Sequence, residues 1–354
     1  MDNTTPFFSI IIPVYNAYTY IGKAVESILE QTYTNFELII VDDCSKDNSL
    51  MLCNEYATKD ERIKVLKNDT NSGASVARNK GLDNALGKYC GFVDADDYID
   101  QRLLETVYEA LSVSNADMLK FGVFEEYYSD KGDLVSCQKF SPGNFTLNDE
   151  EYIKSKAVDL ELVPLFGYMW NSFYKNGRYD STKKRVRLNP EIRINEDFDY
   201  NIRFLSNVKC MQGIDYCAYH YAKRVNNSMS TRKNETYLKD HMRKIYSFIS
   251  LYGSVDFMST VVRRNVFWLY TRYVFSALER SSDDETREKM WKYIKTNEMF
   301  SLFENTSFSG MSIKIRIMTT LLKSKNLKLI TKFAKFITIS KKYAPTKLSS
   351  PCFC

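Results

Sequence analysis

The sequence predicts an α/β fold with a mainly parallel central sheet, followed by a helical C-terminal region. In the first hundred residues, short β-branched apolar runs alternate with stretches of helical periodicity, which is the pattern of strands joined by helices. Nearly continuous apolar runs are typical of strands buried on both faces of a parallel sheet. From residue 236 onward only helical patterns remain. We therefore expect two domains, 1–230 and 231–354.

The predicted elements follow from these patterns in chain order. The runs FFSIIIPV and FELIIV are apolar and β-branched, whereas Ile21, Ala24, Val25 and Ile28 recur at helical spacing. Strands are predicted at 7–14, 36–41, 63–66, 89–93 and 117–128. Helices are predicted at 20–31, 48–58, 75–86, 101–114, 237–252, 255–280 and 284–296. An exposed insertion or hairpin is expected over 129–150.

Polar residues follow three of the predicted strands directly. Tyr15-Asn16 follows the first strand, Asp42-Asp43 the second, and the segment Asp94–Asp97 the strand over 89–93. In open α/β sheets, ligands bind beyond the carboxyl ends of the strands. We therefore expect these three clusters to lie together at one ligand site.

The segment Asp94-Ala95-Asp96-Asp97 places three carboxylates within four residues. Crowded carboxylates raise the cost of ionising one another unless a positive charge lies between them. A hard divalent cation with oxygen ligands supplies such a charge. The segment is therefore a candidate metal and phosphate site, and its alternative interpretation is a strand-to-helix turn with a capping aspartate.

Composition excludes several classes of protein. The polar start Met1–Thr4 does not resemble a signal peptide, and no apolar run approaches the ~18–20 residues that span a membrane. The eight cysteines form no C-x-x-C pair and only two histidines occur, which argues against a zinc site. Scattered cysteines of this kind indicate a reduced, cytoplasmic protein.

The C-terminal tail is strongly basic. No Asp or Glu follows Glu304, while ten of the 49 Lys and Arg residues do, so the remaining 39 face 44 acidic residues and the body is mildly acidic. Apolar residues are interleaved with lysines at helical spacing over 313–343, which predicts a basic amphipathic helix. We expect residues 311–345 to contact an anionic membrane surface. The alternative is a helix packed on the body, and nucleic acid is disfavoured because no recognition motif accompanies the charge.

Five motifs, in order, resemble those of the family 2 glycosyltransferases. The matching segments are Ser9–Asn16 (SIIIPVYN), Phe36–Asp47 (FELIIVDDCSKD), Asn71–Gly81 (NSGASVARNKG), Asp94–Asp97 (DADD) and Asn195–Asp197 (NED). The resemblance covers roughly residues 7–230. It implies a GT-A fold, a Rossmann-like nucleotide-binding domain, and an inverting transfer from a nucleotide sugar.

The resemblance also implies roles on the donor side. Asp96 is expected to hold a divalent metal, Mn²⁺ or Mg²⁺, with Asp94 facing the ribose or sharing the metal, and with Asp97 as a further candidate ligand. Tyr15 is expected to stack on the base, and Asp42 or Asp43 to accept from the uracil N–H. Arg78 is expected to reach the base or the phosphates. Pro13, Asn16 and Ala95 complete the expected nucleotide-binding set.

On the acceptor side, Asp197 is expected to be the catalytic base, with Glu196 as the second choice. Trp170 is expected to stack on the acceptor sugar, or else to be a core aromatic. His220 is a candidate metal ligand whose alternative is a packed histidine. Arg224 and Ser228 resemble a loop that closes over the diphosphate, although Ala222-Lys223 departs from the family's pattern.

Together these observations predict a glycosyltransferase that moves a sugar, expected to come from a UDP-sugar, to a glycan or polyprenyl-diphosphate-linked acceptor in cell-surface polysaccharide synthesis. It is expected to lie on the inner face of the plasma membrane as a peripheral protein. One alternative is a sugar-nucleotide pyrophosphorylase, although the PVYN turn is not the Gly-rich loop of such enzymes. Another is a catalytically silent nucleotide-sugar-binding module at the membrane.

Overall fold

The computed structural model describes residues 5–177, 185–224, 237–281 and 283–343, without the side chains of 338–343. The chain divides into two compact units, Met1–Ser228 and Met229–Cys354. The predicted domain boundary near 230 and the loop residue Ser228 lie outside the described residues.

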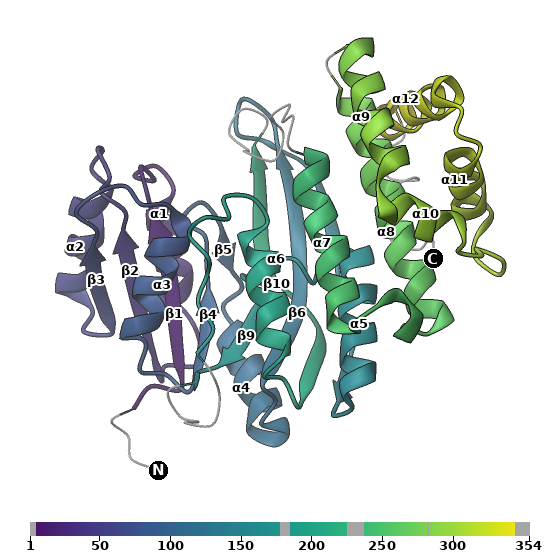
Figure 1. Ribbon diagram of the computed structural model, residues 1–354. Coiled ribbons are helices and arrows are strands. Elements are labelled where there is room, and N and C mark those ends of the chain that lie inside the picture. The colour runs from purple at the N-terminus through teal and green to yellow at the C-terminus, as the bar shows by residue number, and fades with distance from the viewer. Residues whose placement is uncertain (1–4, 178–184, 225–236, 282, 344–354) are drawn as a thin grey trace. The chain divides into compact units, whose positions relative to one another are not determined.

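The N-terminal unit carries the sheet and six helices of its described part (Figure 1). Its strands are β1 (Phe8–Val14), β2 (Phe36–Asp42), β3 (Ile63–Lys67), β4 (Tyr89–Phe92), β5 (Tyr98–Ile99), β6 (Met118–Tyr128), β7 (Leu134–Phe140), β8 (Phe145–Leu147), β9 (Ser172–Lys175) and β10 (Met211–Arg224). Its helices are α1 (Ile21–Leu29), α2 (Ser49–Lys59), α3 (Ala74–Asn84), α4 (Leu103–Ser114), α5 (Glu150–Leu162) and α6 (Glu196–Leu205).

The strands form one mixed sheet in the order β3-β2-β1-β4-β9-β6-β10-β5, with β7 beside β6 and β8 beside β10. Strands β3, β2, β1 and β4 are mutually parallel, and β10 runs parallel to β6. Strand β9 is antiparallel to both β4 and β6, so it joins the two parallel parts. The predicted α/β fold is confirmed, and the carboxyl ends of β1, β2 and β4 meet at one edge, as their parallel pairing requires.

The predicted elements of the first 128 residues occur within a few residues of their expected bounds. The expected insertion at 129–150 is a hairpin that returns along β6 as β7. The core follows the apolar runs: Ile10, Ile11 and Ile12 in β1 and Ile39, Ile40 in β2 are at most 1% exposed. Strands β5, β9 and β10 and helices α5 and α6 were not predicted; β5 and β9 have only two and four residues, and β10 mixes polar with apolar residues.

The C-terminal unit is helical in its described residues (Figure 1). It contains α7 (Tyr237–Leu251), η3 (Val255–Phe257), α8 (Thr260–Arg280), α9 (Asp284–Thr296), α10 (Glu298–Glu304), α11 (Ile313–Lys323) and α12 (Leu327–Tyr343). The helix predicted over 255–280 is interrupted, since Ser259 caps α8 by accepting from the Val262 N–H (3.3 Å). Within the described residues, no helix combines the length and apolarity required to cross a membrane.

Candidate active site

The turn after β1 is tied to the turn after β2 through Asn16. Its backbone N–H donates to Ser45 Oγ (3.0 Å), and its side-chain oxygen accepts from the Lys46 N–H (2.7 Å). Asn16 has φ +50°, in the left-handed region that asparagine tolerates better than most residues. Pro13 lies just before this turn in β1, and the side chain of Tyr15 is exposed. The Tyr15 ring is therefore accessible to a ligand.

The two carboxylates at the end of β2 have different surroundings. Asp43 accepts from the Asn68 amide (2.8 Å) and from the backbone N–H groups of Ser72 (3.0 Å) and Gly73 (2.7 Å), so it holds the loop before α3. Asp42 accepts a backbone N–H through Oδ2, while its buried Oδ1 has no hydrogen-bond partner in the described part of the chain. An unpartnered buried oxygen is unfavourable. Asp42 is fully buried and Asp43 is 2% exposed, so which of the two accepts from the base stays a prediction.

Asp97 stabilises the turn after β4. It is 2% exposed, and its oxygens accept from the Tyr219 hydroxyl (2.8 Å) and the Ala222 N–H (2.9 Å). The Tyr219 oxygen in turn accepts from the Asp94 N–H (3.0 Å). Burial, and then the neighbouring carboxylates, raise the pKa of Asp97 well above its ordinary value. The structure thus corrects the prediction of Asp97 as a metal ligand: it joins the turn to β10.

Asp96 is the solvent-facing carboxylate of the same turn, with 55% of its side chain exposed. Arg224, at the end of β10, donates through Nη2 to the Asp96 carbonyl oxygen (3.2 Å) and lies 3.6 Å from its carboxylate through Nη1. Desolvation, and then the charge of Asp94, raise the pKa of Asp96. Ala95, between the two aspartates, is buried. An exposed carboxylate beside an arginine fits the binding of a metal together with an anionic ligand.

Arg78 on α3 connects this turn to α6. It is 5% exposed, and its guanidinium donates to Asp94 Oδ1 (2.8 Å), Asp197 Oδ1 (3.1 Å) and Glu196 Oε1 (3.4 Å). Burial opposes the charge, but the three carboxylates hold the pKa of Arg78 above its ordinary value. Arg78 is thus held by an ion-pair network within the protein, and its expected contact with the base or the phosphates stays a prediction.

The two carboxylates Glu196 and Asp197 form the first turn of α6, where the helix dipole favours negative charge. Asp197 is held by two donors, Arg78 and the backbone N–H of Met169, which lies 3.3 Å from Oδ2. Desolvation raises the pKa of Asp197, and desolvation followed by the charge of Asp197 raises the pKa of Glu196 to about 7. Asp199 pairs with Arg203 on its own helix, away from this pair.

The raised pKa of Glu196 predicts a pH-dependent stability. The Glu196 carboxyl binds its proton more tightly in the folded state, where its pKa is about 7, than in the unfolded state, where its pKa is 4.5. The free energy of unfolding therefore falls as pH rises from 4.5 through about 7. We expect Glu196→Gln to remove this part of the decline, measured by urea unfolding from about pH 5 to about pH 8. Asp199→Asn is the matched control; an equal change there would contradict the assignment to Glu196.

The turn between α5 and β9 donates the Met169 N–H to Asp197, and two buried side chains that the sequence analysis missed hold this turn in place. Lys120 on β6 is fully buried, and Asn201 lies on α6 with Asp197. Lys120 Nζ donates to the carbonyl oxygens of Leu165, Phe166 and Tyr168 and to Asn171 Oδ1 at 2.9–3.1 Å. Asn201 donates to two of the same carbonyls. A single lysine within the apolar run MLKFGV was the available signal, because a buried cation requires acceptors.

Trp170 belongs to the core of this region. It is 4% exposed, and its ring stacks with those of Tyr168 (4.5 Å between centroids) and Tyr219 (4.3 Å). A sugar ring needs an accessible aromatic face, so the structure corrects the prediction of Trp170 as an acceptor contact in favour of the core-aromatic alternative.

His220 on β10 is not brought together with Asp96. Its Nδ1 lies 2.8 Å from Glu126 and its Nε2 lies 3.0 Å from Asp100, while its ring stacks with Tyr98 and Phe124. Both ring nitrogens are thus engaged by carboxylates, and the packed-histidine alternative replaces the metal-ligand prediction. In the part of the chain described, no three His, Cys, Asp or Glu side chains are grouped as ligands for a metal.

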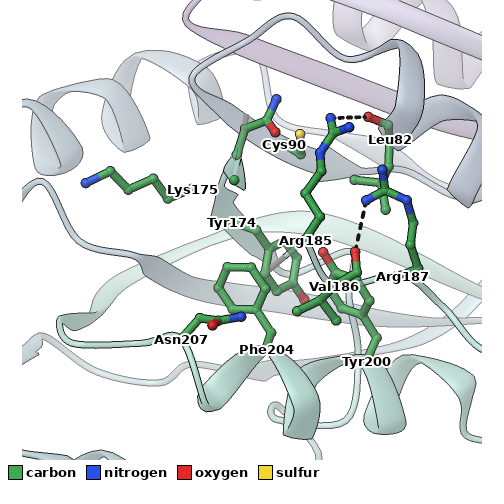
Figure 2. A pocket seen from close by; sticks show the side chains of 12 residues that line it. Leu82, Cys90, Tyr174, Lys175, Arg185, Val186, Arg187, Tyr200, Phe204 and Asn207 are labelled. Atoms are coloured by element: carbon green, nitrogen blue, oxygen red, sulfur yellow. Dashed lines mark hydrogen bonds between the residues drawn. The ribbon is translucent and has the colours of Figure 1, made fainter. Parts of the chain in front are cut away.

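A short segment after residue 184 fastens α6 to α3. Asn79 exchanges hydrogen bonds with the backbone of Leu188 (2.8 and 2.9 Å), and Arg203 donates to the Arg187 carbonyl oxygen (2.7 Å). Figure 2 shows the pocket beside this segment, with Arg185 reaching toward Leu82. Its volume is about 30 Å³, room for a water or two. This pocket is therefore too small for a substrate, and the segment serves to hold Arg78 beside the carboxylates of α6.

Comparison with known proteins agrees with this arrangement. Residues 9–157 match the model of the family described as "Glycosyl transferase family 2". The chain is 31% identical over 233 residues to the putative teichuronic acid biosynthesis glycosyltransferase TuaG of Bacillus subtilis, covering 66% of this chain and 85% of that protein. It is 28% identical over 252 residues to the uncharacterized glycosyltransferase EpsJ of the same organism, covering 70% and 71%.

The fold is also that of a solved structure. Staphylococcus aureus TarS, residues 1–349, in complex with UDP-GlcNAc has a TM-score of 0.61 at 18% identity, covering 95% of this chain and 92% of that one. This likeness gives the fold of the chain, a mixed α/β sheet of the GT-A class. The chain belongs to glycosyltransferase family 2.

Proposed function

We propose that the enzyme transfers a sugar from a UDP-sugar, with inversion, to a glycan or polyprenyl-diphosphate-linked acceptor in cell-surface polysaccharide synthesis. The observation that carries this proposal is the Arg78 network, which joins Asp94 of the β4 turn to Asp197 of α6. This network supports one site in which Asp94 serves the donor and Asp197 serves the acceptor. The teichuronic acid relative and the UDP-GlcNAc complex of TarS support this choice of pathway and donor.

Nucleotide recognition is assigned to the ends of β1 and β2. The exposed Tyr15 ring suits stacking on the base, and Asp42 or Asp43 at the end of β2 is assigned to accept from the uracil N–H. Asp94, held by Arg78, is placed to accept from a ribose hydroxyl. Asp43 supports the site indirectly by holding the loop that precedes α3.

The diphosphate is assigned to Asp96 and Arg224. Mg²⁺ is commonly held by one or two carboxylates plus substrate phosphates, and Mn²⁺ also suits carboxylate ligands, so a lone exposed Asp96 fits an ion that arrives with the donor. Such an ion would neutralise charge on the leaving diphosphate. Arg224 lies beside Asp96 and donates in a planar fork that suits phosphate oxygens.

Asp197 is assigned as the base. It takes the proton from the acceptor hydroxyl while the oxygen bonds to the anomeric carbon and the bond from that carbon to the diphosphate breaks. Its two hydrogen bonds, from Arg78 and Met169, fix the orientation of the carboxylate before the acceptor binds. Glu196, with one long contact to Arg78, remains the second choice.

Replacing Asp96 tests the donor side. We expect Asp96→Ala to weaken the metal-dependent binding of a UDP-sugar by about 10- to 100-fold, a loss of the size that follows when the surroundings of a metal are disturbed. Thermal stabilisation by a panel of UDP- and GDP-sugars with Mn²⁺ or Mg²⁺ measures this, and product analysis by NMR reports the anomeric outcome. Asp60→Ala, at a surface ion pair, is the control. Unchanged metal dependence in Asp96→Ala would contradict the assignment, and binding without turnover on any acceptor would favour the silent binding module.

A further inference from the structure

The basic tail is two helices, not the one predicted. Lys325 has φ +57° and separates α11 from α12. Each helix buries one side: Ile315, Met318 and Leu322 of α11 are nearly inaccessible, as are Ile330 and Ala334 of α12. The Phe333 ring meets Phe275 of α8. Several apolar residues of the predicted membrane-binding helix are therefore buried in the protein instead.

A second set of large apolar side chains remains on the outside of the same helices. Ile313 and Ile317 of α11 are 74% and 45% exposed, and Leu329 and Phe336 of α12 are 48% and 64% exposed. The spacings i, i+4 and i, i+7 place each pair on one side of its helix. Each helix thus has an apolar stripe that packing within the described residues does not cover.

Cations surround these stripes. Arg316 on α11 and Lys328, Lys332 and Lys335 on α12 are exposed. Lys323 and Lys325 are used internally, since Lys323 donates to the carbonyl oxygens of Glu304 and Thr306 and Lys325 pairs with the Glu304 carboxylate. No acidic residue follows Glu304. The exposed side of α11 and α12 is therefore both apolar and uniformly positive, which selects an anionic partner with an apolar interior.

We propose that the exposed sides of α11 and α12 bind an anionic lipid surface, with Ile313, Ile317, Leu329 and Phe336 entering the acyl boundary. Interfacial helices combine apolar residues on one face with lysine and arginine around it, and long lysine stems lie along the apolar zone with their charges at the headgroups. Nucleic acid would bind the cations through its phosphates but would make no favourable contact with the aliphatic residues between them. Binding through this surface would make the enzyme peripheral to an anionic membrane, and the proposal is independent of the assignment of the active site.

The test is co-sedimentation of the full chain with vesicles of phosphatidylcholine, with and without phosphatidylglycerol. We expect binding that requires phosphatidylglycerol and falls with salt. The apolar variant L329S/F336S and the charge variant K328Q/K332Q/K335Q are each expected to bind at least ~10-fold more weakly. Unchanged thermal unfolding and unchanged donor hydrolysis without vesicles show that the fold and the active site are intact.

Matched controls come from other exposed positions. The variant K289Q/K292Q/K295Q removes the same charge from α9, and V113S/F257S removes two exposed apolar side chains elsewhere; both are expected to bind like the wild type. Equal loss in the α9 variant would overturn the proposal in favour of diffuse charge. Equal binding to vesicles with and without phosphatidylglycerol would overturn the proposal. It would also be overturned if the protein did not bind vesicles but bound DNA, and if only the charge variant weakened that binding.

Discussion

Asp197→Asn is expected to lower the rate of sugar transfer by about 10²–10⁴-fold while the protein remains folded. The amide keeps the shape of the side chain, but its single oxygen can accept from only one of the two donors, the Met169 N–H or Arg78, and the amide cannot take the acceptor proton. The measurement is kcat for transfer to an acceptor, together with the affinity for the donor, which should change little. Loss of donor binding instead of kcat would show that Asp197 acts on the nucleotide side.

Two variants in the same helix turn sharpen this result. Asp199→Asn alters a carboxylate that pairs with Arg203, so transfer should stay within a few-fold of wild type. Glu196→Gln should retain most activity if Asp197 is the base. A full-activity Asp197→Asn together with an inactive Glu196→Gln would assign the base to Glu196, whose pKa of about 7 suits proton transfer near neutral pH.

Arg78→Met is expected to destabilise the fold by ~3–5 kcal/mol, because removing one partner of a buried ion pair leaves uncompensated charge. Here three carboxylates, Asp94, Glu196 and Asp197, lose their shared cation at once. Urea unfolding measures the loss. Arg102→Met, which breaks an exposed pair with Glu105, is the control and should change stability little.

The pH dependence of this variant has a definite sign. The charge of Arg78 lowers the pKa values of Glu196 and Asp197, so without the guanidinium these two values rise further and the folded state binds more protons than the unfolded state. The destabilisation of Arg78→Met should therefore be larger at about pH 8 than at about pH 5. An equal loss at both pH values would mean that Arg78 stabilises by packing rather than by charge.

Local pattern was sufficient for the N-terminal half of the sheet. The runs of β1 and β2 are buried along their whole length, so composition alone identifies them, and parallel pairing then brings Tyr15, Asp42 and Asp94 to one edge. Strands β9 and β10 were missed because β9 is short and β10 carries polar side chains, among them Tyr219, which bonds to Asp97, and His220, which bonds to Glu126. Their place in the sheet depends on pairing with segments far away in sequence.

The motifs name candidate site residues but do not give the contacts of their side chains. A motif shows that Asp42, Asp43, Asp96 and Asp97 are close, but not which oxygens the protein itself uses. Both Asp43 and Asp97 accept hydrogen bonds from nearby N–H or O–H groups, whereas one oxygen of Asp42 has no partner among the described residues and the Asp96 side chain is mostly exposed. The stacking of Trp170 on Tyr219 and of His220 on Tyr98 could not be read from the motifs either, because burial and ring stacking arise only from tertiary neighbours.

The sequence by itself determined the fold class, the strand-end carboxylates and the acid-free basic tail, because each is encoded in the order of residues along one stretch of chain. Only the tertiary structure decided that Arg78 joins Asp94 to Asp197, that Lys120 holds the turn at Met169, and which apolar residues of α11 and α12 stay exposed. These facts depend on which distant side chains share a buried volume. Desolvation in that volume determines which charges must be paired and which remain for a ligand.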